Sequence, residues 1–186
     1  MIIREAQIAD APIIAEHLLI ALETIVYQFI GKVDDGEAIA FLQHFIEAKN
    51  NQYTYQHCYV AELDHKIVAA AVVYDGAKLD ELRNPVFEYI KKQYHLDMQM
   101  DPETQAGEFY LDTIAVNRKH QGQGIGTKLL QFIINKYVHQ QKQTLGLLVN
   151  ADNPAAKKLY LRLGFKYVGK RTLLGNVVEH LSMSNE

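Results

Sequence analysis

Three glycines at alternate positions, Gly122, Gly124 and Gly126, lie where a predicted strand over 109–116 gives way to a predicted helix over 124–138. Glycine adopts backbone conformations closed to other residues and lets a ligand come close to the main chain. A helix that begins at such a turn points its free amides and the positive end of its dipole at an anion. The spacing therefore predicts a strand–turn–helix unit that binds an anion, and a pyrophosphate would fit.

Two nucleotide-binding motifs fit this turn poorly. A Walker loop needs G-x-x-x-x-G-K-[ST], which the spacing here does not supply. A dinucleotide fingerprint needs glycine at the position of Thr127 and belongs in an opening strand–helix–strand unit, whereas this turn lies two thirds of the way along the chain. An ordinary glycine turn that only caps a helix remains the structural alternative.

The rest of the chain predicts an α/β fold with hairpin and crossover connections. Asp10 is expected to cap a first helix that has Pro12 in its first turn. Asn84-Pro85 is expected to break or restart the helix over 78–95, because proline lacks the amide that a helix interior needs. Periodicity and turn residues predict the other elements: strands over 2–5, 144–149, 165–170 and 177–183, a hairpin over 58–74, helices over 34–49 and 154–163, and a loop over 97–107.

Size and composition limit the possible classes of protein. With 186 residues, 48% of them hydrophobic, the chain fits a single domain spanning 1–186. No long uninterrupted apolar run or signal-peptide order is evident, so we expect a cytoplasmic protein that does not enter a membrane. Cys58 is the only cysteine, and no Cys/His cluster has metal-ligand spacing, so we expect no metal.

Charge is unevenly divided along the chain. Residues 1–107 carry 17 acidic and 8 basic side chains, whereas residues 108–186 carry 5 acidic and 11 basic ones. A basic half suits an anionic ligand and an acidic half suits a cationic one. We therefore expect a cationic acceptor beside an anionic cofactor, and the overall acidic balance disfavours nucleic acid as a partner.

A second motif follows the glycine turn at residues 150–165. Asn153 and Pro154 begin a predicted helix and Gly164 ends it. Tyr160 shares one face of this helix with residues one turn before and after it, so its ring is expected to point inward. A core aromatic residue with a satisfied hydroxyl is the structural alternative for this tyrosine.

Together, the two segments resemble the signatures of the GCN5-related N-acetyltransferase (GNAT) family, Q/R-x-x-G-x-G/A and N-x-x-A-x-x-L-Y-x-x-x-G-F. The resemblance covers residues 108–171 well; the segment 76–107 is longer or less regular, which suggests a role in substrate choice. It implies a GNAT fold, one domain with a central mixed, mostly antiparallel sheet flanked by helices, and acetyl-CoA as co-substrate. By resemblance, the cofactor-binding residues are Ile114, Ala115, Val116, Gln121, Gly122, Gln123, Gly124, Ile125, Gly126, Thr127 and Asn153.

The family's reaction needs a neutral amine as nucleophile and a proton for the departing thiolate. Resemblance assigns the proton donor to Tyr160 and a base to Asp112, which lies among apolar residues of a predicted central strand. Glu108 and a water chain are the other candidates for the base, and Asp112 could instead fix a loop or recognise a cation. The acceptor is expected to be a primary amine of a small molecule or peptide, and the protein a monomer or homodimer. The alternative is a non-catalytic acyl-CoA-binding regulatory module on the same fold.

Overall fold

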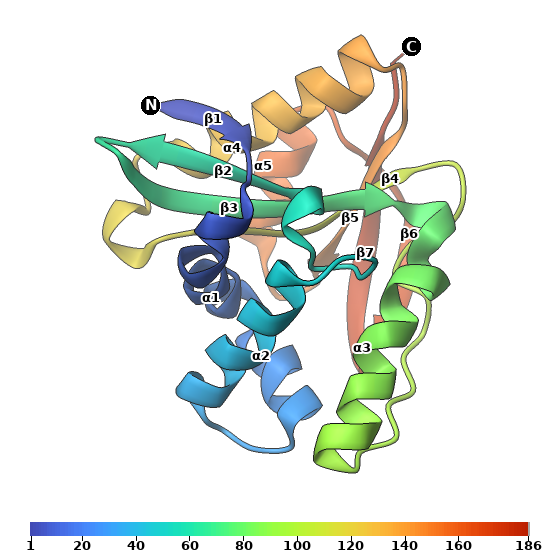
Figure 1. Cartoon of the computed structure of the whole chain (residues 1–186). Helices are drawn as coiled ribbons and strands as arrows, with labels where there is room; N and C mark the ends of the chain where they lie inside the picture. Colours follow the sequence, from blue (N-terminus) through green and yellow to red (C-terminus); the bar gives the residue numbers. More distant parts are fainter. Residues whose placement is uncertain (186) are drawn as a thin grey trace. The chain divides into compact units, whose positions relative to one another are not determined.

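Seven strands form one open mixed sheet in the order β1-β2-β3-β4-β5-β7-β6. The computed structural model describes residues 1–185 (Figure 1). Two compact units share the chain: the first comprises 1–73, 80–98 and 113–130, and the second comprises 74–79, 99–112 and 131 onward. The described pairs β1–β2, β2–β3, β5–β7 and β6–β7 are antiparallel and β4–β5 is parallel, which confirms the predicted mixed, mostly antiparallel sheet.

The first unit begins with the predicted strand and hairpin. β1 (Ile2–Glu5) pairs with β2 (Cys58–Leu63), and β2 turns back into β3 (Lys66–Asp75). Asp64 and His65, at the turn, both have positive φ, 48° and 61°. This is the geometry of a two-residue hairpin turn whose twist matches that of the strands.

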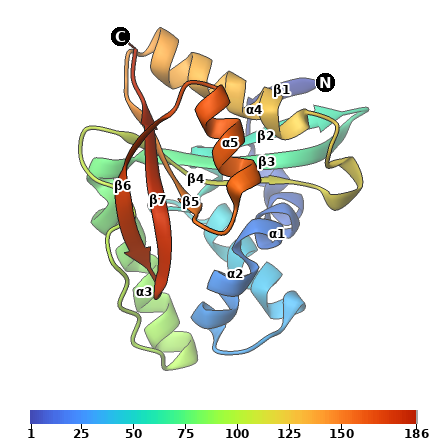
Figure 2. The same cartoon turned by 180° about the vertical axis from the view of Figure 1, so that it is seen from behind.

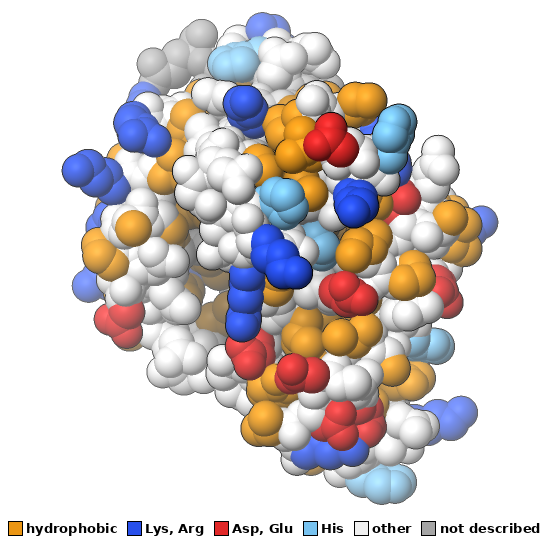
Figure 3. Space-filling model, turned by 90° about the vertical axis from the view of Figure 1, so that its left-hand side faces the viewer, with side chains coloured by type: hydrophobic (Ala, Val, Ile, Leu, Met, Phe, Trp, Pro, Cys, Tyr) orange, Lys and Arg blue, Asp and Glu red, His pale blue; other side chains and the backbone are white. Residues whose placement is uncertain are grey.

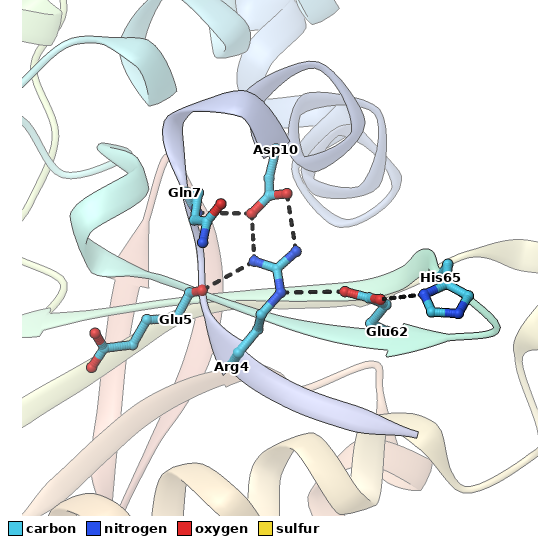
Figure 4. Close-up of polar contacts among 6 residues, drawn as sticks. All are labelled: Arg4, Glu5, Gln7, Asp10, Glu62 and His65. Carbon is cyan, nitrogen blue, oxygen red and sulfur yellow. Dashed lines mark hydrogen bonds and ion pairs between the residues drawn. The ribbon is translucent and has the colours of Figure 1, made fainter.

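Arg4 fastens β1 to the elements on either side of it (Figure 4). Its guanidinium donates two hydrogen bonds to Asp10, of 2.7 and 3.1 Å, and one of 3.3 Å to Glu62 on β2. Asp10 also accepts the Gln7 amide at 2.8 Å. Asp10 does occupy the N-cap position of the first helix, but its side chain does not cap that helix as expected. The carboxylate turns back to Arg4 because a bidentate charged partner binds it more strongly than one free amide.

Three helices of the first unit meet through aromatic side chains. α1 (Ala11–Ile30) and α2 (Asp35–Glu47) follow β1, and α3 (Leu79–Tyr94) follows β3. Phe29 of α1, Phe41 of α2 and Tyr89 of α3 lie in ring contact, with Phe41 6.0 Å from each of the other two. α3 runs unbroken through Pro85, so the expected break is wrong. Burial of Val86 and Ile90 on the same helix stabilises it against the lost hydrogen bond.

The stretch Ile8–Ile30, which includes α1, is long and apolar enough to cross a membrane by length and composition alone, with a mean hydropathy of 1.6. Half of this stretch is buried inside the structure. Residues at helical spacing, among them Ile14, Leu18 and Leu22, supply that buried face. Core helices of soluble proteins pass the same hydropathy test, so the stretch alone carries no membrane assignment.

The second unit holds the end of the sheet. β4 (Phe109–Val116) pairs with β5 (Leu145–Asn150). β5 pairs on its other side with β7 (Asn176–Met183), and β6 (Lys166–Leu173) forms the edge of the sheet. α5 (Pro154–Arg162) lies over β5 and β7 (Figure 2), where Lys157 bonds Glu179 of β7 at 2.6 Å. β6 and β7 are both longer than the strands predicted at 165–170 and 177–183.

The helix after the glycine turn lies where it is predicted but changes type along its length. α4 spans Ile125–Ile134 and then widens into a π-helix over Asn135–Gln140. The wider turn buries Tyr137 and brings its ring 4.6 Å from that of Phe109. Apolar periodicity does not distinguish a π turn from an α turn, which explains the difference.

Candidate active site

The glycine turn joins β4 to α4 in the first unit, as the sequence predicts. Gly122 and Gly124 both have φ of +76°, a conformation that side chains disfavour. Gly126 serves a different purpose, since a methyl group there would lie 3.2 Å from Val116 Cγ2, so glycine lets α4 approach the strand. The Gln121 side chain donates to the Val116 carbonyl at 3.1 Å. The signature glutamine thus fixes the turn to the end of β4.

The turn fits the anionic part of acetyl-CoA. Residues 121–124 are exposed, and no atom of another segment lies within 4 Å of where a side chain would begin on Gly122 or Gly124. The amides of the first turn of α4 have no acceptor within the helix. Arg118 and Lys119 are exposed cations just before the turn. Open amides, a helix N-terminus and two cations suit a pyrophosphate.

From Leu111 onward, β4 presents two unequal faces. Leu111, Thr113 and Ala115 are buried, whereas Asp112, Ile114 and Val116 on the other face are only half-buried. The sequence predicts this division of residues but not the difference in exposure. The accessible face carries the predicted base and two of the three residues assigned to the pantetheine arm, whose role stays a prediction.

Asp112 contacts a tyrosine whose hydroxyl also lies beside a second carboxyl group, and the sequence singles out neither of these residues. Its Oδ2 accepts a 3.0 Å hydrogen bond from the hydroxyl of Tyr74, at the end of β3. The same hydroxyl lies 3.2 Å from Oε1 of Glu103. Tyr74 and Glu103 are both buried, with 1% and 4% of their surface exposed. A tyrosine at the end of an apolar strand is a weak signal in the sequence, and Glu103 lies in an irregular loop that gives none.

Glu108, the second candidate for the base, is engaged in buried hydrogen bonds. Its Oε2 lies 2.9 Å from His180 Nε2, and Oε1 accepts from Thr104 at 2.8 Å. Burial opposes ionisation, but these hydrogen bonds and the charges of His180 and Arg171 outweigh it and lower the pKa of the Glu108 carboxyl. A carboxylate held in this way is a poor proton acceptor, which argues against Glu108 as the base; the choice of Asp112 stays a prediction.

Gly146 of β5 makes room for the Glu108 carboxylate. A methyl group at position 146 would lie 2.2 Å from Glu108 Oε2. A strand glycine suggests a bulge, a close approach or plain packing, and the structure shows a close approach by a carboxylate.

Tyr160 and Asn153 both belong to α5. Tyr160 is half-buried on the face shared with Ala156 and Leu163, and its ring lies 5.9 Å from that of Phe165. Burial raises the pKa of its phenol, so the hydroxyl keeps its proton at neutral pH. The Asn153 side chain accepts the Ala156 amide at 3.1 Å and so caps the helix; its contact with the cofactor stays a prediction.

An acidic hollow lies on the first unit, where α1 and α2 reach the surface. Its volume is about 310 Å³, and Glu16, Glu23, Asp35 and Arg118 line it together with Leu19, Ile20 and Ile39. The Tyr27 hydroxyl donates to Asp35 and lies 3.3 Å from Glu23. Acidic side chains gather below a group of Lys and Arg side chains on this side of the molecule (Figure 3). Three carboxylates and one guanidinium give the hollow a negative balance.

Residues 19–165 match the family model described as "Acetyltransferase (GNAT) family". The chain belongs to the GNAT acetyltransferase family. A solved acetyltransferase is 32% identical over the full length of both chains, with a TM-score of 0.83. A Salmonella typhimurium protein, yncA, solved with its cofactor acetyl-CoA, covers 100% of this chain and 94% of its own with 18% identity and a TM-score of 0.58. The GNAT fold and acetyl-CoA as the family's co-substrate are confirmed.

One curated relative is the spermine/spermidine N(1)-acetyltransferase of Bacillus subtilis (strain 168). It is 29% identical over 86 residues, which are 46% of this chain and 57% of the relative. The match thus spans little more than half the length of that protein.

Proposed function

We propose that this GNAT protein transfers an acetyl group from acetyl-CoA to a primary amine by direct attack in a ternary complex. Acetyl-CoA, when bound, supplies the activated acetyl group. The observation that carries the proposal is Asp112, a carboxylate on the accessible face of β4 with one oxygen fixed by Tyr74. Such a group can accept the proton that an ammonium must lose before it becomes a nucleophile.

The other residues of the signature have separate tasks. The amides of Gly122 to Thr127 would hold the pyrophosphate, and residues 114–116 would align the pantetheine arm. Tyr160 keeps a proton at its hydroxyl that can pass to the departing thiolate. None of these tasks requires a covalent bond between the protein and the acetyl group.

Initial rates measured with both substrates varied test the direct attack. We expect intersecting double-reciprocal lines, and Asp112→Asn should lower kcat by about 10²-fold or more with little change in acetyl-CoA affinity. Parallel lines would indicate a covalent intermediate. Acetyl-CoA binding without turnover would favour the regulatory module.

The acceptor itself is proposed to be cationic, such as a polyamine or a basic peptide. The acidic hollow of α1 and α2 supports this, since its carboxylates attract ammonium groups and its apolar residues suit a methylene chain. The partial match to a spermine/spermidine acetyltransferase agrees with the same chemistry.

A double variant that removes two carboxylates from the hollow tests this class of acceptor. Glu16→Gln combined with Glu23→Gln should raise KM for a diamine or polyamine about two- to fivefold and leave KM for a neutral monoacetylated analogue unchanged, given the modest strength of exposed ion pairs. Glu47→Gln, which removes an exposed carboxylate on α2 outside the hollow, is the matched control. An equal change for cationic and neutral acceptors would contradict the proposal.

A further inference from the structure

A chain of buried polar groups connects β6 and β7 to the segment before β4. His180 of β7 lies at its centre, with 3% of its surface exposed. Its Nε2 is 2.9 Å from Oε2 of Glu108, the residue before β4. Its Nδ1 is 3.4 Å from a terminal nitrogen of Arg171 on β6. The imidazole therefore bridges a carboxyl group and a guanidinium within the second unit.

The two contacts together indicate the protonation state of the imidazole. A guanidinium has donors and no acceptor, so Nδ1 can form a hydrogen bond with Arg171 only when it carries no proton. The single ring proton then lies on Nε2, which donates it to Glu108. His180 is neutral in this arrangement, with one ring nitrogen donating and the other accepting.

Both partners of the imidazole also hold the segment before β4. The Arg171 guanidinium donates to the Pro102 carbonyl at 3.3 Å and to Gln105 Oε1 at 2.9 Å. The Thr104 hydroxyl, which lies between these two anchors, donates to Glu108 Oε1 at 2.8 Å. The segment is thus tied to the imidazole through the guanidinium on one side and the carboxylate on the other.

Two glycines allow this segment to pack closely against the rest of the unit. A methyl group on Gly76 would lie 2.3 Å from the Gln105 carbonyl oxygen and 2.5 Å from Thr104 Oγ1. A methyl group on Gly146 would lie 2.2 Å from Glu108 Oε2. The close approach at both positions shows that the segment is built into the unit although it has no regular secondary structure.

The segment carries Glu103 to the proposed active site. Glu103 is 4% exposed, and its Oε1 lies 3.2 Å from the hydroxyl of Tyr74. The same hydroxyl donates to Asp112 at 3.0 Å. A displacement of the segment would therefore disturb the tyrosine that fixes the proposed base.

We propose that His180 and Arg171 are positioning residues, which hold the segment 102–105 in place through a neutral imidazole. When His180 takes up a second proton, its Nδ1–H faces an N–H of Arg171, and two cations meet at 3.4 Å. The hydrogen bond between them is lost and repulsion replaces it. Arg171 then moves away from the ring, and the segment that it holds becomes mobile.

The charges around His180 determine how it responds to its second proton. Two charged groups, Glu108 and Arg171, lie within hydrogen-bond distance of the imidazole in the part of the chain that the structure describes. Glu179, the preceding residue of β7, points to the opposite face of the sheet and pairs with Lys157 of α5 at 2.6 Å. The register partners on the adjacent strands do not ionise: Leu148 of β5 and Gly169 of β6. Glu108 favours an imidazolium, but it lies at the other ring nitrogen and does not relieve the repulsion at Arg171.

NMR of the wild-type protein tests the proposal without any variant. With ¹⁵N-labelled histidine at pH 8, His180 should show a proton on Nε2 and none on Nδ1. As the pH is lowered and the ring takes up its second proton, the amide order parameters of 103–107 should fall from about 0.85, typical of rigid backbone, to below about 0.6. A proton on Nδ1 at pH 8, or a segment that stays rigid while the ring titrates, would overturn the proposal.

Two variants separate the imidazole from the guanidinium. His180→Gln keeps a donor for Glu108 and an acceptor for Arg171 but does not titrate, so the segment should stay rigid at the pH where that of the wild type becomes mobile. Arg171→Leu has no donor, so its segment should be mobile already at pH 8. Lys170→Gln removes the exposed cation next to Arg171 on β6 and is the matched control. A pH response retained in His180→Gln, or a rigid segment in Arg171→Leu, would contradict the assignment.

The consequence for catalysis rests on the proposed function, in which Asp112 is the base. On acidification, kcat of the wild type should fall about tenfold further than kcat of His180→Gln, while the two have the same KM for acetyl-CoA. Equal pH profiles would show that the segment does not position the base. If Asp112→Asn keeps wild-type kcat, the proposed base fails, whereas the NMR experiment still decides whether His180 and Arg171 hold the segment.

Discussion

Tyr160 keeps its proton because burial raises the pKa of its phenol above the ordinary value of a tyrosine. Tyr160→Phe should therefore lower kcat by about 10²-fold while leaving acetyl-CoA affinity and the melting temperature close to wild type. The raised pKa means that the protonated form persists across the neutral range, so the loss should be the same from pH 6 to pH 9. Steady-state rates beside Tyr167→Phe measure this effect. A kcat within twofold of wild type would remove Tyr160 from the mechanism.

Gly146 is required by the side chain that lies against it. Gly146→Ala would place a methyl group 2.2 Å from Glu108 Oε2 and push the carboxylate away from His180. We expect a loss of about 2–3 kcal/mol in the free energy of unfolding, from overpacking and strained buried hydrogen bonds. Gly169→Ala on β6 has no atom within 4 Å of its methyl group and is the control. Equal stability of the two variants by denaturant unfolding would contradict this explanation.

The sequence predicts the chemistry of single residues where a motif marks them. Asp112 and Tyr160 lie where strand alternation and helix spacing put them. Tyr74 and Glu103 could not be predicted, because their contact joins positions 29 residues apart through a loop without periodicity. Asp10 shows the same limit, since its partner is chosen by tertiary geometry and not by its place before a helix.

The glycine turn acts through backbone conformation. Gly124→Ala would force an alanine to φ of +76°, at a cost of about 1–2 kcal/mol, or else change the turn. We expect acetyl-CoA to bind about tenfold more weakly by titration calorimetry. Gly36→Ala on α2, where φ is not positive and the methyl group meets only an ordinary contact, should bind acetyl-CoA as wild type does. Equal affinity in both variants would show that the turn does not hold the cofactor.

Most helices and strands follow from apolar periodicity and turn residues, and their ends are the least predictable part. The hairpin and the helix after Asn153 appear where the sequence places them. The uninterrupted α3 and the π-helix after α4 do not, because burial stabilises a helix through Pro85 and selects a wider turn near Tyr137. Local sequence states a preference that packing can override.

The whole molecule is predicted to unfold as one domain. β3 and β4 each run through both compact units, so neither unit has complete strands without the other. Calorimetry should show a single transition with an enthalpy of about 130 kcal/mol near 60 °C, equal to the van't Hoff value. Two resolved transitions would mean that the units unfold separately.

Acetyl transfer to a cationic amine is tested by mass spectrometry of the products formed from acetyl-CoA and a panel of diamines, polyamines, basic peptides and neutral or acidic amines. Acetylated cationic amines are the expected products, with one CoA thiol released for each acetyl group transferred. Binding of acetyl-CoA without acetylation of any amine, or acetylation of neutral or acidic amines alone, would contradict the proposed function.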